Sequence, residues 1–113
     1  DEVEPHLYLA RIHRRMERPQ LAAEAIRQAE QIAPQDPAVH RELGFLLLDT
    51  GQPDVAARRF EYALELDKES SEGWIGLVRA LRAAGRGDEV EQVIAEAPAE
   101  VRALLAQPRT DSI

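Results

Sequence analysis

The stretch DPAVHRELGFLLLDTGQPDVAARRFEYALELDKES, residues 36–70, predicts two helices joined by a tight turn. Apolar and small side chains recur at helical spacing on both sides of Gly51: Leu43, Gly44 and Leu47 before it, and Ala56, Phe60 and Ala63 after it. Glycine can adopt a left-handed backbone conformation without steric cost, so it commonly follows the last residue of a helix. We therefore predict helices over about residues 37–50 and 53–67, with the second packed back on the first.

The same layout recurs when the chain is shifted by 34 residues in either direction. Four columns of equivalent residues show it: Leu9, Leu43 and Leu77; Ala22, Ala56 and Val90; Ile26, Phe60 and Ile94; Ala29, Ala63 and Ala97. Further helices are expected over about residues 3–17, 19–33, 71–84, 88–97 and 99–107. Their expected N-caps include Asp36, Ser70 or Ser71, and Asp88, whose side chains can accept hydrogen bonds from the first turn.

The 34-residue period and the L-G … A-x3-F pattern resemble the tetratricopeptide repeat, a helix–turn–helix unit that stacks into a superhelix. The resemblance implies an all-α, right-handed superhelical solenoid with repeats over about residues 3–36, 37–70 and 71–97. A capping helix over about residues 98–107 and a tail over 108–113 would complete the chain. We expect residues 1–113 to form a single domain that is a fragment of a longer protein.

Composition excludes several classes of function. The formal net charge is −7, which argues against binding to nucleic acid, and no apolar run approaches the ~20 residues that span a bilayer. The chain has no cysteine, which removes disulfides, zinc–thiolate sites and thiol nucleophiles. The glycines lack the strand context of a phosphate loop, and no serine has a histidine base at a motif spacing. We expect a chain that is not an enzyme and holds no cofactor.

The histidines fall in columns of large packing residues. His6 and His40 share a column with Trp74, and His13 shares one with Leu47 and Leu81. A zinc site would need three or four ligands that converge on one point, which these columns do not supply. We expect the histidines to pack within the repeats and not to bind a metal.

In tetratricopeptide repeats the first helix of each pair lines an inner groove that holds peptides. The resemblance places ten candidate residues there: Leu7, Arg11, Arg14, Arg15, Arg41, Phe45, Leu48, Ile75, Arg79 and Arg82. Their six arginines face the neighbouring Glu4, Asp49 and Glu72, a local excess of three positive charges. Arginine binds carboxylates through paired hydrogen bonds, so we expect a peptide with acidic and apolar residues, or a free C-terminal carboxylate. Alternatively, these arginines pair within the chain and form a solvated face.

Two other functions remain open at this point. Ile12 shares a column with Leu46 and Ala80, which in a stack should touch a preceding repeat, so the N-terminal edge is a candidate surface for a homo-oligomer or another partner. The chain is alternatively a substrate-recruiting appendage of an upstream enzyme domain. No targeting signal in the sequence decides between a cytoplasmic and a periplasmic location.

Overall fold

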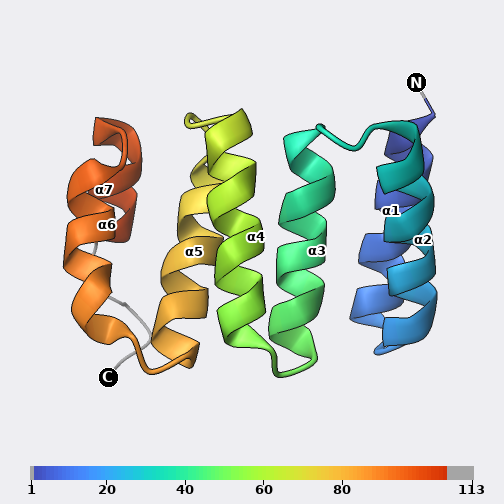
Figure 1. Cartoon of the computed structure of the whole chain (residues 1–113), viewed down its shortest axis with the longest axis horizontal. Coiled ribbons are helices and arrows are strands. Elements are labelled where there is room, and N and C mark those ends of the chain that lie inside the picture. The colour runs from blue at the N-terminus through green and yellow to red at the C-terminus, as the bar shows by residue number, and fades with distance from the viewer. Residues whose placement is uncertain (1, 107–113) are drawn as a thin grey trace.

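The computed structural model describes residues 2–106 as a row of helices (Figure 1). Its α-helices are α1 (Val3–Arg15), α2 (Pro19–Ile32), α3 (Pro37–Asp49), α4 (Pro53–Leu66), α5 (Ser71–Ala83), α6 (Val90–Glu96) and α7 (Ala99–Leu105). A 3-10 turn, η1 (Gly87–Glu89), precedes α6. The described residues contain no strand, and none of their helices is long and apolar enough to cross a membrane. The prediction of an all-α helical repeat solenoid is confirmed, while the predicted tail, residues 108–113, lies outside the described residues.

The helix ends follow from side-chain capping and from glycine. Asp36 Oδ1 accepts a hydrogen bond of 2.9 Å from the backbone N–H two residues on, and Ser70 Oγ accepts one of 3.1 Å from the N–H three residues on. Both residues were predicted as N-caps, and both caps are confirmed. At the opposite ends of α3 and α5, Gly51 and Gly85 have φ angles of 77° and 75°, in the left-handed region that glycine tolerates.

The start of α6 differs from the prediction. Asp88 was expected to cap this helix, but it lies inside η1, and α6 begins at Val90 without a side-chain cap. The guanidinium of Arg86 explains the tighter turn, because it donates to Glu89 Oε2 at 2.7 Å and to Asp54 Oδ1 at 3.1 Å. These bonds tie the turn to α4, and the hydrogen bond from Arg86 lowers the pKa of Glu89 below its ordinary value.

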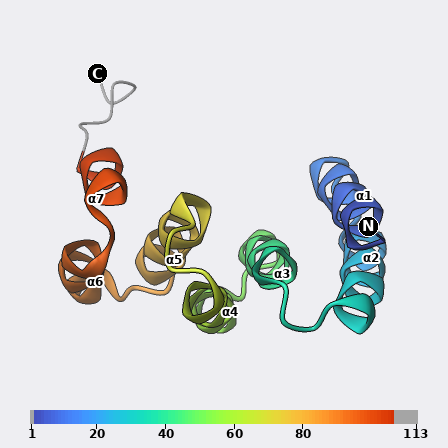
Figure 2. The same cartoon turned by 90° about the horizontal axis from the view of Figure 1, so that it is seen from above.

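Seen from above, the helices trace an open arc (Figure 2). The first helices of the hairpins, α1, α3 and α5, lie along its inner side, and the second helices, α2 and α4, lie along its outer side. α1 contacts α3 and α3 contacts α5, so the inner row is continuous. At the C-terminal end α7 packs against α5 and α6 and buries Val101 in their shared core.

Two hydrogen bonds repeat at the same period as the sequence. His40 Nε2 lies 2.8 Å from the carbonyl oxygen of Pro34, and Trp74 Nε1 donates to the carbonyl oxygen of Lys68 at 2.8 Å. Each ring is buried, and its hydrogen bond holds the loop that precedes its helix, six residues earlier in the chain. The two pairs are 34 residues apart, so a histidine and a tryptophan perform the same structural role in successive hairpins.

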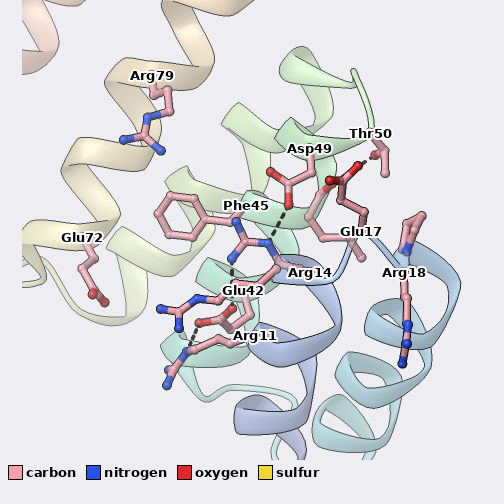
Figure 3. Close-up of a pocket in the computed structure, with 13 residues that line it drawn as sticks. Arg11, Arg14, Glu17, Arg18, Glu42, Phe45, Asp49, Thr50, Glu72 and Arg79 are labelled. Carbon is pink, nitrogen blue, oxygen red and sulfur yellow. Dashed lines mark hydrogen bonds and ion pairs between the residues drawn. The ribbon is translucent and has the colours of Figure 1, made fainter.

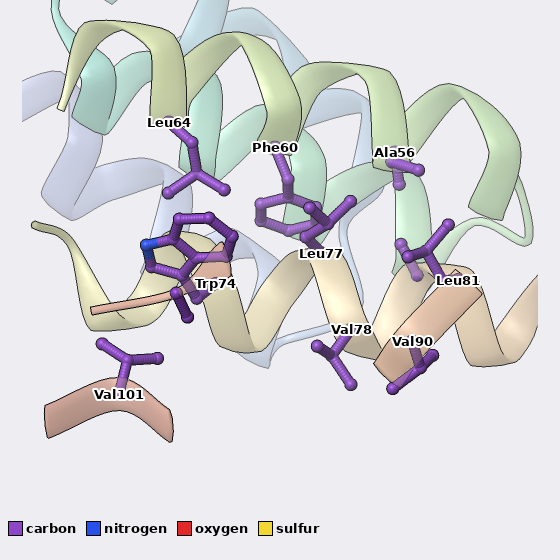
Figure 4. Packing of buried hydrophobic residues seen from close by; sticks show 12 residues of the cluster. Ala56, Phe60, Leu64, Trp74, Leu77, Val78, Leu81, Val90 and Val101 are labelled. Carbon is purple, nitrogen blue, oxygen red and sulfur yellow. The ribbon is translucent and has the colours of Figure 1, made fainter. Parts of the chain in front are cut away.

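The ring of Phe60 in α4 is fully buried between α3 and α5 (Figure 4). A Cβ atom on Gly44 of α3 would lie 2.7 Å from the ring's Cζ, and one on Gly76 of α5 would lie closer still. Both helices therefore approach α4 closely only because glycine stands at these positions. The sequence placed Gly44 among the small and apolar residues of the packed helix face but gave Gly76 no packing role.

Gly76→Ala should destabilise the fold by about 1–3 kcal/mol, because the added methyl overlaps a ring that has no free space to move into. This loss outweighs the roughly 1 kcal/mol by which alanine favours a helix over glycine. Urea unfolding followed by circular dichroism measures the change.

The matched control is Gly87→Ala, since no atom lies within 4 Å of the added Cβ there. We expect this variant to stay within about 0.5 kcal/mol of the wild type. Equal stabilities for the two variants would contradict the packing described for Phe60.

Candidate functional site

An open cavity of about 760 Å³ lies on the inner side of the arc, against α1, α3 and α5 (Figure 3). Charged side chains dominate its lining: Arg11, Arg14, Arg15, Glu17, Arg18, Glu42, Asp49, Glu72 and Arg79, with Pro19, Phe45, Leu46 and Thr50. α1 and the turn after it form one wall, α5 contributes to the opposite wall, and α3 lies between them.

Glu42 on α3 is the buried charge of this cavity. Only 7% of the residue is exposed, and its Oε2 accepts a hydrogen bond of 2.6 Å from Arg11 Nε. Its Oε1 lies 3.6 Å from a guanidinium nitrogen of Arg14. A buried carboxylate is costly unless it is paired, so these two arginines of α1 allow Glu42 to stay inside. The hydrogen bond that Arg11 donates to Glu42 also raises the pKa of Arg11 above its ordinary value.

Arg14 joins the charged network to an aromatic contact. Its Nε donates to Asp49 Oδ2 at 2.8 Å, and its guanidinium carbon lies 5.3 Å from the centroid of the Phe45 ring. The Phe45 ring in turn meets Phe60 edge to face, at 4.9 Å between centroids. Arg14 is thus held by charge, by hydrogen bonding and by the face of an aromatic ring.

The lining carries five arginines and four carboxylates, so its charge is nearly balanced. The lining has an excess of one positive charge where three were predicted. It includes Glu17 and Glu42 as well as Arg18, and it does not include Arg41, Arg82 or Glu4. Two of the five arginines are engaged by Glu42 and Asp49. The guanidinium groups of the other three, Arg15, Arg18 and Arg79, make no ion pair or hydrogen bond with the described residues.

Five of the ten predicted groove residues line the cavity: Arg11, Arg14, Arg15, Phe45 and Arg79. Three of these form one repeat column, Arg11, Phe45 and Arg79, which faces the cavity in all three hairpins. The prediction for Leu7 is wrong: it is fully buried in the core cluster of α1, α2 and α3. It lies on the same helix face as Val3 and Ala10, which are also buried.

The other four predicted residues lie outside the cavity lining. Arg41 is half-buried and pairs with Glu72 at 3.7 Å. Leu48 is half-buried against the core cluster that α4, α5, α6 and α7 form. Ile75 is half-buried on α5, and Arg82 is exposed near the C-terminal end of α5.

Several lining residues come from positions that the repeat pattern did not indicate. Glu17 and Arg18 belong to the turn between α1 and α2, where Glu17 has a φ angle of 56°, and Pro19 is the first residue of α2. A turn that reaches into the groove has no periodic signal. Glu42 shares its column with Tyr8 and Gly76, neither of which is charged, so the column itself predicts no buried carboxylate.

Glu42→Gln keeps the shape of this side chain but removes its charge from between two guanidinium groups. We expect a loss of about 1–3 kcal/mol in the free energy of unfolding, because both arginines lose a charged acceptor. Urea titration of the full chain measures it.

Glu72→Gln is the control, since that side chain is 74% exposed and its pair with Arg41 spans 3.7 Å. Exposed pairs contribute at most about 1 kcal/mol, so this variant should remain close to the wild type. An unchanged stability for Glu42→Gln would mean that the network does not help to hold α1 against α3.

Comparison with known families agrees with the repeat pattern. Two family models described as tetratricopeptide repeat match the chain, one over residues 3–46 and the other over residues 47–107. The second alone spans more than half of the 113 residues. No curated protein gives a match. The resemblance inferred from the 34-residue period is confirmed, and the chain belongs to the tetratricopeptide repeat family.

Proposed function

We propose that this chain binds an extended peptide segment of another protein, carrying acidic and apolar side chains, in the cavity against α1, α3 and α5. Repeats of this family generally mediate protein–protein interactions and typically act as non-catalytic scaffolds. The observation that carries the finer proposal is that three guanidinium groups around one cavity, those of Arg15, Arg18 and Arg79, have no partner within residues 2–106.

The unpaired arginines are better placed to bind a ligand than the paired ones. A ligand carboxylate that binds Arg11 must compete with the buried Glu42 at 2.6 Å, and leaving Glu42 unpaired would be costly. Arg18 and Arg79 offer charge-assisted hydrogen bonds without displacing a partner. In Figure 3 Arg79 lies beside Phe45, whereas Arg18 lies farther away, beyond Arg14. A peptide that reached both would pass the aromatic ring and the Arg14 guanidinium.

Phe45 supplies the apolar part of the proposed site. Its ring is half-buried, with one side packed toward Phe60 and Arg14 beside it. An apolar side chain of the peptide gains by covering the remaining exposed surface of this ring. Alternation of acidic and apolar residues in an extended segment matches this arrangement of charges at the walls and an aromatic ring between them.

Arg79→Glu and Arg18→Glu test the proposal. The probes are fluorescent peptides in which Asp or Glu alternates with Leu or Phe, each prepared with a free and an amidated C-terminus. We expect either variant to weaken binding at least about tenfold, because a charge-assisted hydrogen bond contributes roughly 1.5–3 kcal/mol. Fluorescence anisotropy measures the affinity, which should also fall as salt is raised.

Arg58→Glu is the matched control: it makes the same change in net charge at an exposed position of α4 that does not line the cavity. Loss of binding in this variant as large as in Arg79→Glu would show that the peptides respond only to net charge. A preference for the free C-terminus would identify a terminal carboxylate as the ligand. Binding by none of the acidic peptides would refute the proposal.

A further inference from the structure

Exposed apolar side chains gather on the first hairpin. Seven large hydrophobic residues are exposed in the described part of the chain, and five of them belong to α1, α2 or the turn between them: Tyr8, Leu9, Met16, Leu21 and Ile32. Tyr8 is 64% exposed and Met16 is 51% exposed. Such a concentration of apolar surface on one element is characteristic of an interaction site.

The repeat columns show which way the α1 residues face. Leu9 is 45% exposed, whereas its equivalent on α5, Leu77, is 4% exposed in the core shared with α4. Three residues further along, Leu46 on α3 and Ala80 on α5 are buried beside the preceding hairpin, but the equivalent Ile12 on α1 is only half-buried. The same positions are therefore covered wherever a second helix precedes them.

Leu21 and Ile32 of α2 face the same side as these α1 residues. Their equivalents on α4 are Val55 and Leu66, and Arg59 on the same helix forms an ion pair with Glu30 of the preceding hairpin at 4.0 Å. Val55 and Leu66 are half-buried, whereas their α2 equivalents Leu21 and Ile32 are 49% and 43% exposed. In Figure 2 no helix stands on this side of α1 and α2.

We propose that this surface docks a further helical hairpin of the same repeat type. The surface lies at the α1–α2 end of the row of helices and is distinct from the outer side of the arc. It is called here the outer face of the first hairpin and comprises Tyr8, Leu9, Ile12, Met16, Leu21 and Ile32. Both junctions between successive hairpins within the chain bury the equivalents of Tyr8 and Ile12, and the junction with α5 also buries the equivalent of Leu9. Docking on the outer face therefore continues an interface that the chain already uses twice. None of these six residues lines the cavity, so the proposal is independent of peptide binding.

The side chains of the outer face also specify the second helix of the docked hairpin. Phe60 of α4 fits against α5 only because Gly76 leaves room for its ring, and the residue equivalent to Gly76 on α1 is Tyr8. A helix with an aromatic residue at the Phe60 position would collide with Tyr8. α2 carries Ile26 at that position and packs against α3, whose equivalent residue is Glu42 rather than glycine. The partner helix must therefore resemble α2 at this position, with Ile or a smaller residue there.

Two extended chains test the proposal. In the first, a copy of residues 1–34 precedes Asp1, which preserves the 34-residue period and presents an α2-type helix. In the second, a copy of residues 35–68 precedes Asp1 and presents the α4-type helix with its phenylalanine. We expect the first extension to raise the midpoint of thermal unfolding by about 5 °C or more in a single transition. The second should leave the midpoint unchanged.

Leu9→Glu supplies the control within the interface. In the original chain the side chain is exposed, so the midpoint should shift by no more than about 2 °C; in the first extended chain the substitution should abolish the gain. The proposal is overturned if neither extension raises the midpoint or if both raise it equally.

A second copy of the chain is the competing occupant. Sedimentation velocity of the original chain at high micromolar concentration distinguishes a dimer of the chain from a monomer. A dimer that Leu9→Glu dissociates would assign the outer face to self-association and overturn the proposal. A monomer, together with stabilisation by the first extension alone, would support it.

Discussion

The Phe60 ring occupies space that two glycines leave open, and the spacing of α3, α4 and α5 follows from this contact. An alanine in place of either Gly44 or Gly76 would put a methyl group within 3 Å of ring atoms. Because the ring is fully buried, it cannot yield to such a group by turning toward solvent. One aromatic side chain therefore sets the approach of both neighbouring inner helices, and through them the distance across the middle of the arc.

The same ring connects the core to the cavity. Phe60 meets Phe45 edge to face, Phe45 lies beside the Arg14 guanidinium, and Arg14 bonds Asp49 and approaches Glu42. α3 is thus fixed on one side by apolar packing against α4 and on the other by ion pairs to α1. The arginines of α1 that form ion pairs in this network, Arg11 and Arg14, hold the wall of the cavity in place, which leaves ligand binding to the arginines at its margin.

The period of 34 residues was sufficient to predict the hairpins, because the columns that define it consist of apolar or small residues, most of which the fold buries. The cavity was only partly predictable. The column of Arg11, Phe45 and Arg79 faces it throughout, but one turn earlier the column of Leu7, Arg41 and Ile75 lies at the edge of the core. At such an edge the side chain decides: Leu7 is fully buried in the core, whereas Arg41 stays largely covered and directs its guanidinium toward Glu72. Gly76 was missed for a related reason, since its role depends on the phenylalanine opposite and not on its own column.

Counting charges along the groove gave too large an excess because the repeat register left out Glu17 and Glu42 and included Arg41 and Arg82. The count also treated all arginines as equivalent. Two of them neutralise carboxylates that the fold itself requires, and the available positive charge lies where α1 ends and, across the cavity, on α5. α1 thereby takes part in two surfaces at once: one side carries Arg11, Arg14 and Arg15 toward the cavity, and the other carries Leu9 and Ile12 on the outer face. A hairpin docked on that outer face would restrain the helix that supplies one wall of the peptide site. Pairing with Glu42 already orients α1, and a docked hairpin would restrain this helix further. The two restraints together would lower the conformational entropy that is lost when a peptide binds.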